Sequence, residues 1–346
     1  MTFRSRPLGL GLPVCNTRQE DKMSKLLVAI ADTVFPDWKP AEQVLAPLNV
    51  ELQRAATPSK DDILAVAQNA EAVFVTYAQM TAEVIAGLEN CKVIGRFGVG
   101  TDNIDIDAAT AAGIVVTYAP LYCLDEVSDH AMTTLLALAR KIPLANSMVH
   151  SGRWEMPAVV PIRRFKGRTL GLIGIGNIAQ AIIGKAQAFG IKTIAADPYA
   201  PDDVFAKNNT EKVDLDELLA QSDYISVHAP LTPETENMFS TEAFSKMKND
   251  ALLINTSRGP LVDIDALAKA LDAGEIGGAA LDVLPQEPPA ADNPLFGRDD
   301  VILTPHTGFY SEDALLDLQT TVATDVAAVL GGERPKFPVN PQVLDG

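Results

Sequence analysis

The sequence predicts an α/β protein built from two doubly wound parallel sheets. Its 346 residues suffice for two domains, and hydrophobic residues make up 47% and charged residues 21% of the chain, as in folded globular proteins. From Lys25 onward, short apolar runs alternate with amphipathic stretches of helical period, the pattern of parallel strands joined by crossover helices. This alternation falls into two separate blocks, which predicts two sheets.

The first block is predicted to hold four strands and three helices. Residues 1–23 precede it and are expected to form a disordered leader, with Met23 as an alternative start. Strands are expected in the apolar runs at residues 26–32, 72–77, 91–98 and 114–120, with helices at residues 61–70, 81–90 and 106–113. No phosphate-binding glycine pattern occurs in this block.

A long helix over residues 124–149 is expected to bridge the two blocks, with acidic residues in its first turn, where negative charge is favourable. The second block has six apolar runs, as in a complete doubly wound sheet, at residues 169–173, 192–197, 223–230, 251–257, 277–283 and 301–305. An amphipathic helix over residues 311–330 is expected to return to the first block. The expected domains are therefore residues 24–123 with 310–346, and residues 124–309.

Composition excludes several classes of function. The chain has 28 Lys and Arg against 45 Asp and Glu, and its net charge of −17 would be repelled by nucleic acid and by anionic membrane surfaces. No apolar run reaches the roughly 20 residues of a transmembrane helix. Cys15, Cys91 and Cys123 form no C-x-x-C pair, so we expect no disulfide and a cytoplasmic location. No residues are predicted to bind a metal.

A dinucleotide-binding pattern opens the second block. Gly174, Gly176 and Ala179 follow the apolar run TLGLI and begin a helical stretch, with Asn177 and Ile178 in its first turn. Gly174 permits a tight turn, and Gly176 lets backbone amides approach a pyrophosphate at the helix N-terminus. Ala179 is small enough for the helix to pack closely on the strand. Without a nucleotide, these residues would serve only a strand-to-helix turn.

Asp197 ends the next apolar run, close to the offset of roughly 20 residues expected for the acid that binds the ribose 2′-hydroxyl. A carboxylate at this point repels a 2′-phosphate, and no Arg follows among the next three residues. The cofactor is therefore predicted to be NAD rather than NADP. The alternative for Asp197 is an ordinary loop carboxylate at a strand end.

Three polar side chains follow later apolar runs: Arg258 after ALLINTS, Glu287 after ALDVLPQ and His306 after VILTP. Ligands bind outside the carboxyl ends of the strands in open α/β sheets, so we expect these side chains at one rim. Arg258 can hold a carboxylate through two parallel hydrogen bonds, His306 can exchange a hydroxyl proton, and Glu287 can orient the imidazole and favour its protonated form. Each alone could be a surface or rim residue, but together they indicate hydride-transfer chemistry on a 2-hydroxy acid.

The segments NTSRGPLVD, GGAALDVLPQEP and TPHTGFYSEDA resemble the motifs of the D-isomer-specific 2-hydroxyacid dehydrogenase family, and the resemblance covers nearly the whole chain. The segments LYCLDEVSDHAM and PVNPQVL are similar to the branch of the C-terminal-binding proteins and phosphoglycerate dehydrogenases. This family implies a flavodoxin-like substrate domain, an inserted Rossmann NAD-binding domain and a homodimer. Its catalytic Arg, Glu and His match Arg258, Glu287 and His306.

The resemblance also implies roles for residues with weaker signals of their own. In GRFGVGTDNID, the backbone amides of Val99 and Gly100 would receive the substrate carboxylate, as expected of a bare turn. The remaining roles concern the cofactor: Thr256 and Asp282 would lie at the nicotinamide, and His228 and Pro230 would lie along the adenosine half.

Three other residues have no match of this kind. His130 and His150 are expected to be structural, and Trp154 either lies near the cleft or packs against the protein. Gly308 stands where many members of the family have Ala, which affects the shape of the cleft rather than the reaction type.

The resemblance implies an NAD-dependent reductase of a small 2-oxo acid such as glyoxylate or hydroxypyruvate. Two alternatives stay open. One is oxidation of 3-phosphoglycerate, for which phosphate-binding side chains cannot be located in the sequence. The other is an NAD(H)-sensing interaction protein of corepressor type. A regulatory domain like that of some phosphoglycerate dehydrogenases is not expected, because few residues follow Leu330.

Overall fold

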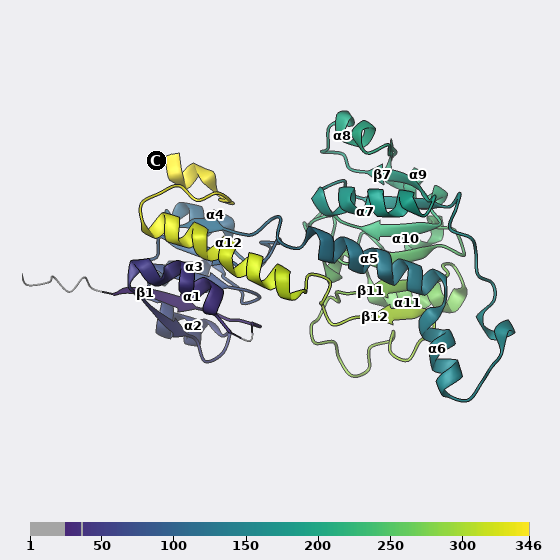
Figure 1. The fold of residues 1–346 in the computed structure, drawn as a ribbon, viewed down its shortest axis with the longest axis horizontal. Helices are drawn as coiled ribbons and strands as arrows, with labels where there is room; N and C mark the ends of the chain where they lie inside the picture. The colour runs from purple at the N-terminus through teal and green to yellow at the C-terminus, as the bar shows by residue number, and fades with distance from the viewer. Residues whose placement is uncertain (1–24, 36, 346) are drawn as a thin grey trace, which may run out of the picture.

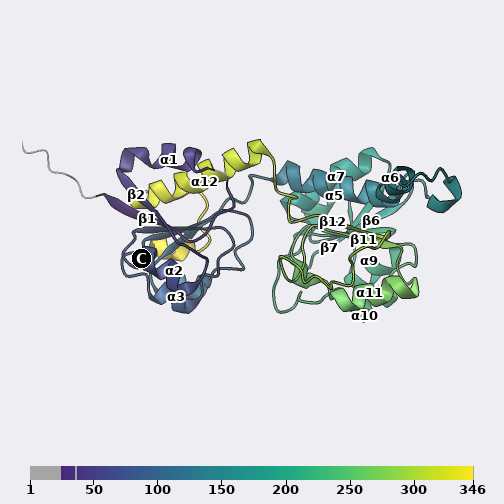
Figure 2. The same cartoon turned by 90° about the horizontal axis from the view of Figure 1, so that it is seen from below.

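Two parallel sheets, each flanked by helices on both faces, lie side by side along the long axis of the molecule (Figures 1 and 2). The structure is a computed structural model, and it describes residues 25–35 and 37–345. The expected leader, Met23 and Cys15 lie outside the described residues. The prediction of two doubly wound parallel sheets is confirmed.

The first sheet has five parallel strands in the order β2-β1-β3-β4-β5, as in a flavodoxin-like fold. Its strands are β1 (Leu26–Ile30), β2 (Val50–Arg54), β3 (Ala72–Val75), β4 (Val93–Arg96) and β5 (Val115–Thr117). Its helices are α1 (Lys39–Leu45), α2 (Lys60–Ala67), α3 (Ala82–Ala86), α4 (Ile106–Ala111) and α12 (Glu312–Leu330), with 3₁₀ turns η1 (Ala46–Leu48) and η4 (Pro341–Asp345). Strand β2 and helix α1 were not predicted, and β2 lacks a continuous apolar run because it is a half-exposed edge strand.

The second sheet has seven parallel strands in the order β12-β11-β10-β9-β6-β7-β8. The six predicted strands are present as β6 (Thr169–Ile173), β7 (Lys192–Ala196), β9 (Tyr224–Val227), β10 (Leu252–Asn255), β11 (Gly278–Leu281) and β12 (Val301–Leu303), and the short edge strand β8 (Glu211–Lys212) is additional. Its helices are α7 (Asn177–Ala188), α8 (Asp202–Lys207), α9 (Leu215–Gln221), α10 (Thr241–Lys246) and α11 (Ile264–Ala273), with the 3₁₀ turn η3 (Gly259–Leu261). The strand order reverses beside β6, which is where such sheets bind ligands.

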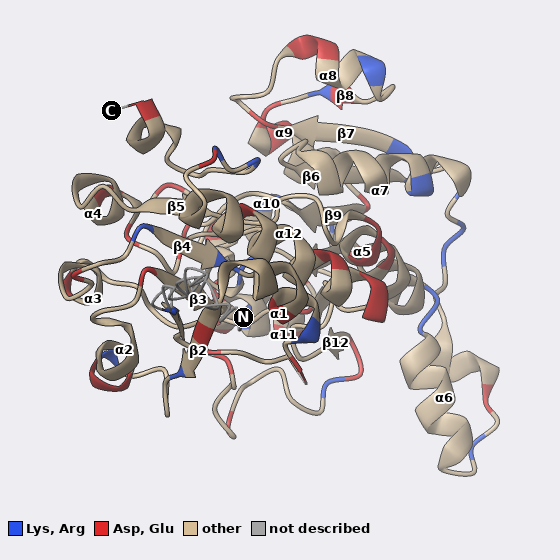
Figure 3. Ribbon diagram, turned by 60° about the vertical axis from the view of Figure 1, so that its left-hand side comes forward, with Lys and Arg blue, Asp and Glu red and all other residues tan. Residues whose placement is uncertain are grey.

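The predicted single helix over residues 124–149 is two helices, so that prediction is wrong. Helix α5 (Leu124–Ala139) ends before Lys141, which has a left-handed φ of 52°, and α6 (Ile142–His150) starts beyond it. Pro143 in the first turn of α6 explains the break, because proline lacks an amide hydrogen and restricts the residue before it. Helix α6 and the 3₁₀ turn η2 (Met156–Val159) project from the second domain (Figures 1 and 3).

Helix α12 carries the chain back to the first sheet, where it lies over β4. Gly95 of β4 permits this packing, since a Cβ there would lie 2.6 Å from Val326 Cγ2 and 2.9 Å from Val322 Cγ1. Beyond the helix, the buried side chain of Asn340 accepts a hydrogen bond of 2.7 Å from the amide of Val116. The C-terminal segment therefore packs with the first block of the chain.

Basic and acidic residues, blue and red on the ribbon, occur in both domains (Figure 3). In the part of the chain that the structure describes, no helix is both long and apolar enough to span a membrane. Cys91 and Cys123 are free thiols.

Candidate active site

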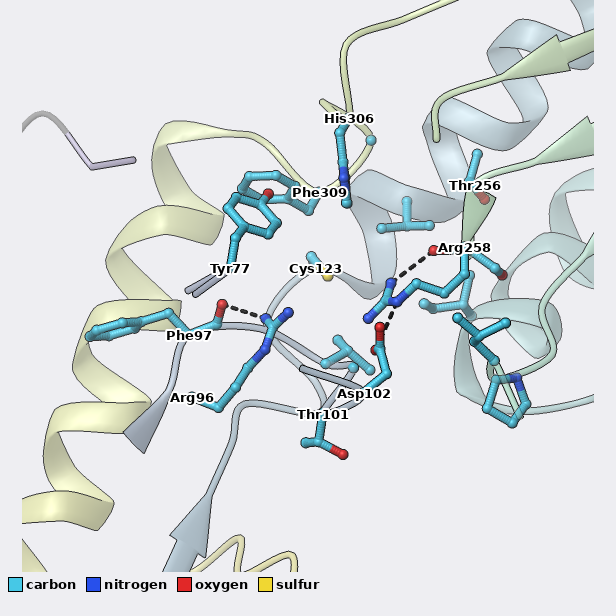
Figure 4. Close-up of a pocket in the computed structure, with 18 of the residues that line it drawn as sticks. Tyr77, Arg96, Phe97, Thr101, Asp102, Cys123, Thr256, Arg258, His306 and Phe309 are labelled. Carbon is cyan, nitrogen blue, oxygen red and sulfur yellow. Dashed lines mark hydrogen bonds and ion pairs between the residues drawn. The ribbon is translucent and has the colours of Figure 1, made fainter. Parts of the chain in front are cut away.

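A cavity of about 590 Å³ lies between the two domains, and residues of both line it. The first domain contributes the ends of β3 and β4 and the loops after them, with Tyr77 and residues 96, 97 and 99–102. The second domain contributes residues 228–231, 256–258, 306, 308 and 309, which follow strands of its sheet (Figure 4). The carboxyl ends of parallel strands meet at one edge of a sheet, so the two sheets bring these loops to the same space.

The turn between β6 and α7 has the geometry of an anion-binding site. Gly174 has a φ of 86°, and a Cβ there would lie 2.9 Å from the carbonyl oxygen of His228. Gly176 is the N-cap of α7, no side chain caps the helix, and a Cβ on Gly176 would meet open space. The amides of Asn177 and Ile178 in the first turn lack intrahelical acceptors, and the helix dipole favours negative charge there. The turn therefore fits a pyrophosphate.

Asp197 lies beside this turn at the end of β7. Its carboxylate accepts hydrogen bonds from the amides of Ile175 (3.1 Å), Tyr199 (3.0 Å) and Ala200 (3.1 Å), and further lone pairs can accept from ribose hydroxyls. In the cavity between the domains, the buried hydroxyl of Thr256 has no hydrogen-bond partner among the described residues. A buried hydroxyl without a partner is unfavourable, so it suits a polar group of a bound molecule. The residues present fit a dinucleotide.

His228 and Pro230 line the same cavity beyond the end of β9. The Nε2 atom of His228 lies 2.8 Å from the hydroxyl oxygen of Ser226. Burial lowers the pKa of His228 to about 3, so the ring is neutral at physiological pH. His228 is therefore an uncharged part of the cavity wall.

Arg258 is held by an ion pair that crosses between the domains. Its Nε donates to Asp102 Oδ1 at 2.9 Å, and its Nη1 donates to the carbonyl oxygen of Ser257 at 2.8 Å. Burial alone would raise the pKa of Asp102, but the charge of Arg258 and its hydrogen bond outweigh burial and lower it. Gly100 packs against the guanidinium, since a Cβ there would lie 1.4 Å from Arg258 Nη2. The structure thus brings Arg258 together with the turn that holds Val99 and Gly100.

His306 and Glu287 form the second ion pair of the site. His306 Nδ1 lies 2.7 Å from Glu287 Oε2, and Glu287 Oε1 accepts a hydrogen bond of 3.0 Å from the amide of Leu284. Burial alone would raise the pKa of Glu287, but the hydrogen bond and charge of His306 outweigh burial and lower it. The imidazole points into the cavity toward the side where Arg258 lies (Figure 4). Glu287 does not line the cavity and binds the ring through Nδ1, on the side away from it.

Residues 132–308 match the family model described as D-isomer specific 2-hydroxyacid dehydrogenase, NAD binding domain, just over half of the chain. The chain belongs to this family. The match spans the glycine turn, Asp197 and the segment that bears Arg258, Glu287 and His306, so the second sheet lies in the family's NAD-binding domain.

Curated relatives in this family carry more than one name. The chain is 41% identical over 292 residues to a D-3-phosphoglycerate dehydrogenase of Methanocaldococcus jannaschii, covering 84% of this chain but only 55% of that protein. It is 39% identical to a glyoxylate reductase of Thermofilum pendens, covering 83% of this chain and 86% of the relative. The chain thus spans about half the length of the phosphoglycerate dehydrogenase and most of the reductase.

Solved structures show the same architecture. A D-lactate dehydrogenase of Aquifex aeolicus, crystallised with NAD and lactic acid, superposes with a TM-score of 0.82 at 29% identity and covers 89% of this chain and 96% of its own. A glyoxylate reductase of Paecilomyes thermophila gives a TM-score of 0.83 at 26% identity, covering 92% of this chain and all of its own.

Asp282 holds the loop that carries His306. Its buried carboxylate accepts hydrogen bonds from the Thr304 hydroxyl (2.5 Å) and from the amides of Thr307 (2.9 Å) and Gly308 (2.8 Å). Its carbonyl oxygen accepts a hydrogen bond of 2.8 Å from the amide of His306, whose φ is 53°. A Cβ on Gly308 would lie 2.8 Å from Asp282 Oδ2, so the glycine leaves room for this carboxylate. Asp282 also lines the cavity.

Two other residues were singled out in the sequence. His130 was expected to be structural, and its Nε2 lies 3.0 Å from Thr304 Oγ1 and 3.4 Å from Asp282 Oδ1, so it supports the same loop. Trp154 neither lines the cavity nor packs within the described chain, because it is 88% exposed.

Several polar residues of the cavity were not predicted from the sequence, among them Tyr77, Arg96 and Asp102. Arg96 ends β4 and Asp102 lies beyond it, so the two flank the glycine turn of the GRFGVGTDNID segment, for which only backbone amides were predicted to have a role. Tyr77 lies just beyond β3. Polar residues at and after the strand ends of the first sheet are the signal that could have identified them.

Proposed function

We propose that the chain is an NAD-dependent D-2-hydroxyacid dehydrogenase that works as a reductase of a small 2-oxo acid such as glyoxylate or hydroxypyruvate. One observation carries this proposal: the His306–Glu287 pair and the Arg258–Asp102 pair meet at one cavity beside the turn of Val99 and Gly100. That arrangement offers a proton donor, a carboxylate anchor and a charge that stabilises the developing alkoxide.

Each residue has a separate part in the reaction. Arg258 and the amides of Val99 and Gly100 bind the substrate carboxylate and orient C2. Protonated His306 gives its proton to the C2 oxygen, and Glu287 orients the ring and stabilises its positive charge. The nicotinamide supplies the hydride in reduction and accepts it in oxidation.

The cofactor is held by residues of the second domain. Gly174, Gly176, Asn177 and Ile178 bind the pyrophosphate, and Asp197 binds the ribose hydroxyls and repels a 2′-phosphate. Two further pairs complete the proposed site: His228 and Pro230 border the adenosine half, and Thr256 and Asp282 border the nicotinamide. The division into a substrate domain (residues 24–123 with 310–346) and an NAD-binding domain (residues 124–309) is part of this proposal.

Oxidation of 3-phosphoglycerate is the second candidate activity. The relatives named D-3-phosphoglycerate dehydrogenase, with up to 41% identity, favour it. It requires a site for a phosphate group in addition to the carboxylate, so comparing phosphorylated and unphosphorylated substrates separates the two activities.

We also propose that two copies of the chain associate through the segment that projects from the second domain and that the dimer is cytoplasmic. Exposed apolar side chains concentrate on α6 and the residues after it, namely Ile142, Val149, Trp154, Met156 and Val160. Exposed apolar clusters of this kind mark protein contacts. Light scattering at micromolar concentration should give a dimer mass; a monomer mass for the wild type would rule the assembly out.

The activity is tested by NADH oxidation against a panel of 2-oxo acids, with NADPH in parallel. His306→Ala should lower turnover by about 100-fold or more, because general acid catalysis contributes a factor of that order, while NADH binding persists. Equal turnover in His306→Ala would remove His306 from its role. Binding of NADH with no turnover of any acid would favour an NAD(H)-sensing interaction protein instead.

A further inference from the structure

His130 is a polar side chain of helix α5 that the proposed reaction does not use. It does not line the cavity, and its side chain is 21% exposed. Helix α5 packs across β10, β11 and β12, and the imidazole lies near the ends of the last two strands, which Asp282 and Thr304 directly follow. The sequence predicts only a structural role for this histidine.

A chain of two hydrogen bonds links the His130 ring to the Asp282 carboxylate. The hydroxyl of Thr304 lies 2.5 Å from Asp282 Oδ1, and the Nε2 atom of His130 lies 3.0 Å from the same hydroxyl oxygen. The direct separation between His130 Nε2 and Asp282 Oδ1 is longer, at 3.4 Å. The ring therefore reaches the carboxylate through Thr304.

The direction of this chain follows from where its protons can be. An ionised carboxylate only accepts hydrogen bonds, so the single hydroxyl proton of Thr304 goes to Asp282. The hydroxyl oxygen then offers only lone pairs to His130, and Nε2 must carry a proton. Both the neutral ring protonated at Nε2 and the imidazolium meet this condition. His130 is thus the donor in this contact, whatever its charge.

The His130 ring contacts the loop of His306 on both sides of that residue. Thr304 precedes His306 by two positions, and Gly308 follows it by two. A Cβ on Gly308 would lie 3.5 Å from His130 Cδ2, so the edge of the ring lies beside this glycine. One side chain of α5 therefore braces both arms of the loop that carries the proposed proton donor.

This loop holds His306 in a backbone conformation that needs support. His306 has a φ of 53°, in the left-handed region that residues with a side chain rarely adopt. Its amide donates to the carbonyl oxygen of Asp282 at 2.8 Å, and its imidazole points into the cavity (Figure 4). Such a conformation persists only where the surrounding contacts enforce it. The hydrogen bonds of Asp282 and the two contacts of His130 supply this support.

We infer that His130 is a positioning residue for the proposed proton donor: through Thr304 and Asp282 it fixes the loop that aims His306 at the substrate oxygen. This inference rests on the proposed function and adds a side chain from a separate helix to it. A merely structural residue changes how much enzyme is folded, whereas a positioning residue changes the rate of the step in which His306 gives up its proton.

Single-turnover kinetics separate these two roles. Enzyme and NADH at equal concentrations, well above their dissociation constant, are mixed with a saturating amount of the 2-oxo acid that gives the highest wild-type kcat/KM. The fast loss of NADH absorbance yields a rate constant for the chemical step and an amplitude for the fraction of active enzyme. His130→Met, which has no donor, should lower the rate constant by about 10-fold or more, with unchanged amplitude and NADH affinity. A rate constant within about 2-fold of the wild type, at any amplitude, would overturn the inference.

A rescue variant tests whether the donor at Nε2 is the operative group. His130→Gln places an amide N–H close to the position of Nε2, so its rate constant should return to within about 3-fold of the wild type. Thr133→Met is the matched control, because Thr133 lies on the exposed side of the same helix, and it should change the rate constant by less than about 2-fold. If His130→Gln is as slow as His130→Met, the hydrogen bond has no part in positioning and the inference is wrong.

Thr304→Val tests the route through the hydroxyl, and it keeps the inference testable if His130→Met does not fold. It removes the hydroxyl but keeps the shape of the side chain, so the rate constant should fall by about 10-fold or more; a wild-type value would overturn the inference. The double variant should be no more than about 2-fold slower than Thr304→Val, because both changes break one chain, whereas losses that multiply to about 100-fold would contradict it.

The wild-type enzyme distinguishes failure of this inference from failure of the proposed function. If it turns over no 2-oxo acid, both are overturned. If it turns over an acid at a rate that neither His130→Met nor Thr304→Val changes, the dehydrogenase proposal stands and only the role of His130 is overturned.

Discussion

Replacing Gly100 by Ala should disable the carboxylate anchor without disturbing the cofactor site. The added methyl carbon would stand 1.4 Å from Arg258 Nη2, and an ordinary contact needs about 3.4 Å, so the guanidinium must move by about 2 Å. A shift of that size breaks the bond of 2.9 Å between Arg258 and Asp102 and removes Arg258 from the turn. A charge-assisted hydrogen bond contributes about 1.5 to 3 kcal/mol, which corresponds to a loss of about 10- to 100-fold in kcat/KM.

The assay is steady-state NADH oxidation with the best 2-oxo acid of the panel. The loss should fall mainly on KM for the acid, with NADH affinity unchanged, because Gly100 belongs to the first sheet's loops and not to the turn before α7. Gly184→Ala is the matched control: it adds the same methyl group in α7, where a Cβ meets open space, and should leave activity within about 2-fold. A Gly100→Ala enzyme with kcat/KM within about 2-fold of the wild type would refute the carboxylate site assigned to this turn.

Three further substitutions test stability, cofactor choice and proton transfer. Asp223→Asn should lower the free energy of unfolding by about 2 kcal/mol at neutral pH, since it weakens bonds to two cations and an amide, whereas the exposed Asp250→Asn should change it by less than about 0.5 kcal/mol. Burial alone would raise the pKa of Asp223, but these bonds lower it. The difference in unfolding free energy between Asp223→Asn and the wild type is therefore present above about pH 4 and shrinks as pH falls through the lowered pKa. Denaturant unfolding at several pH values that gives a constant difference would contradict this. Asp197→Asn should raise the ratio of NADPH to NADH activity by about 10-fold, because it removes the charge facing a 2′-phosphate, and an unchanged ratio would argue against the ribose role. Glu287→Gln should lower reductive kcat/KM by about 10-fold at neutral pH and more at alkaline pH, because the protonated form of His306 loses its ion-pair partner; a pH profile parallel to that of the wild type would count against this role.

Two kinds of feature could be recognised from the sequence: strands that form continuous apolar runs, and the glycine turn between a strand and a helix. Five of the six runs of the second block correspond to central strands, which are apolar because they are buried on both faces, and the sixth is the half-buried edge strand β12, whose three residues are all apolar. Strand β2 escaped recognition since an edge strand is buried on one side only, so its residues do not form an apolar run. The break between α5 and α6 depends on Lys141, which is left-handed, and on Pro143. Pro143 is a local signal of a helix boundary, but the helical periodicity on both sides of it favoured one continuous helix.

For the site, local sequence patterns were enough to identify residues that follow the apolar runs: the glycine turn, Asp197, Arg258, Glu287 and His306. Their types and their places after apolar runs are local properties, which a linear sequence carries. The pairing of Asp102 with Arg258, and the hydrogen bonds by which Asp282 holds the loop of His306, became visible only in the folded structure. Those are relations between segments up to 156 residues apart, and neither partner's local pattern specifies them. The pair of Arg258 and Asp102 depends on how the two sheets present their carboxyl ends to one space, which no local pattern of either segment encodes.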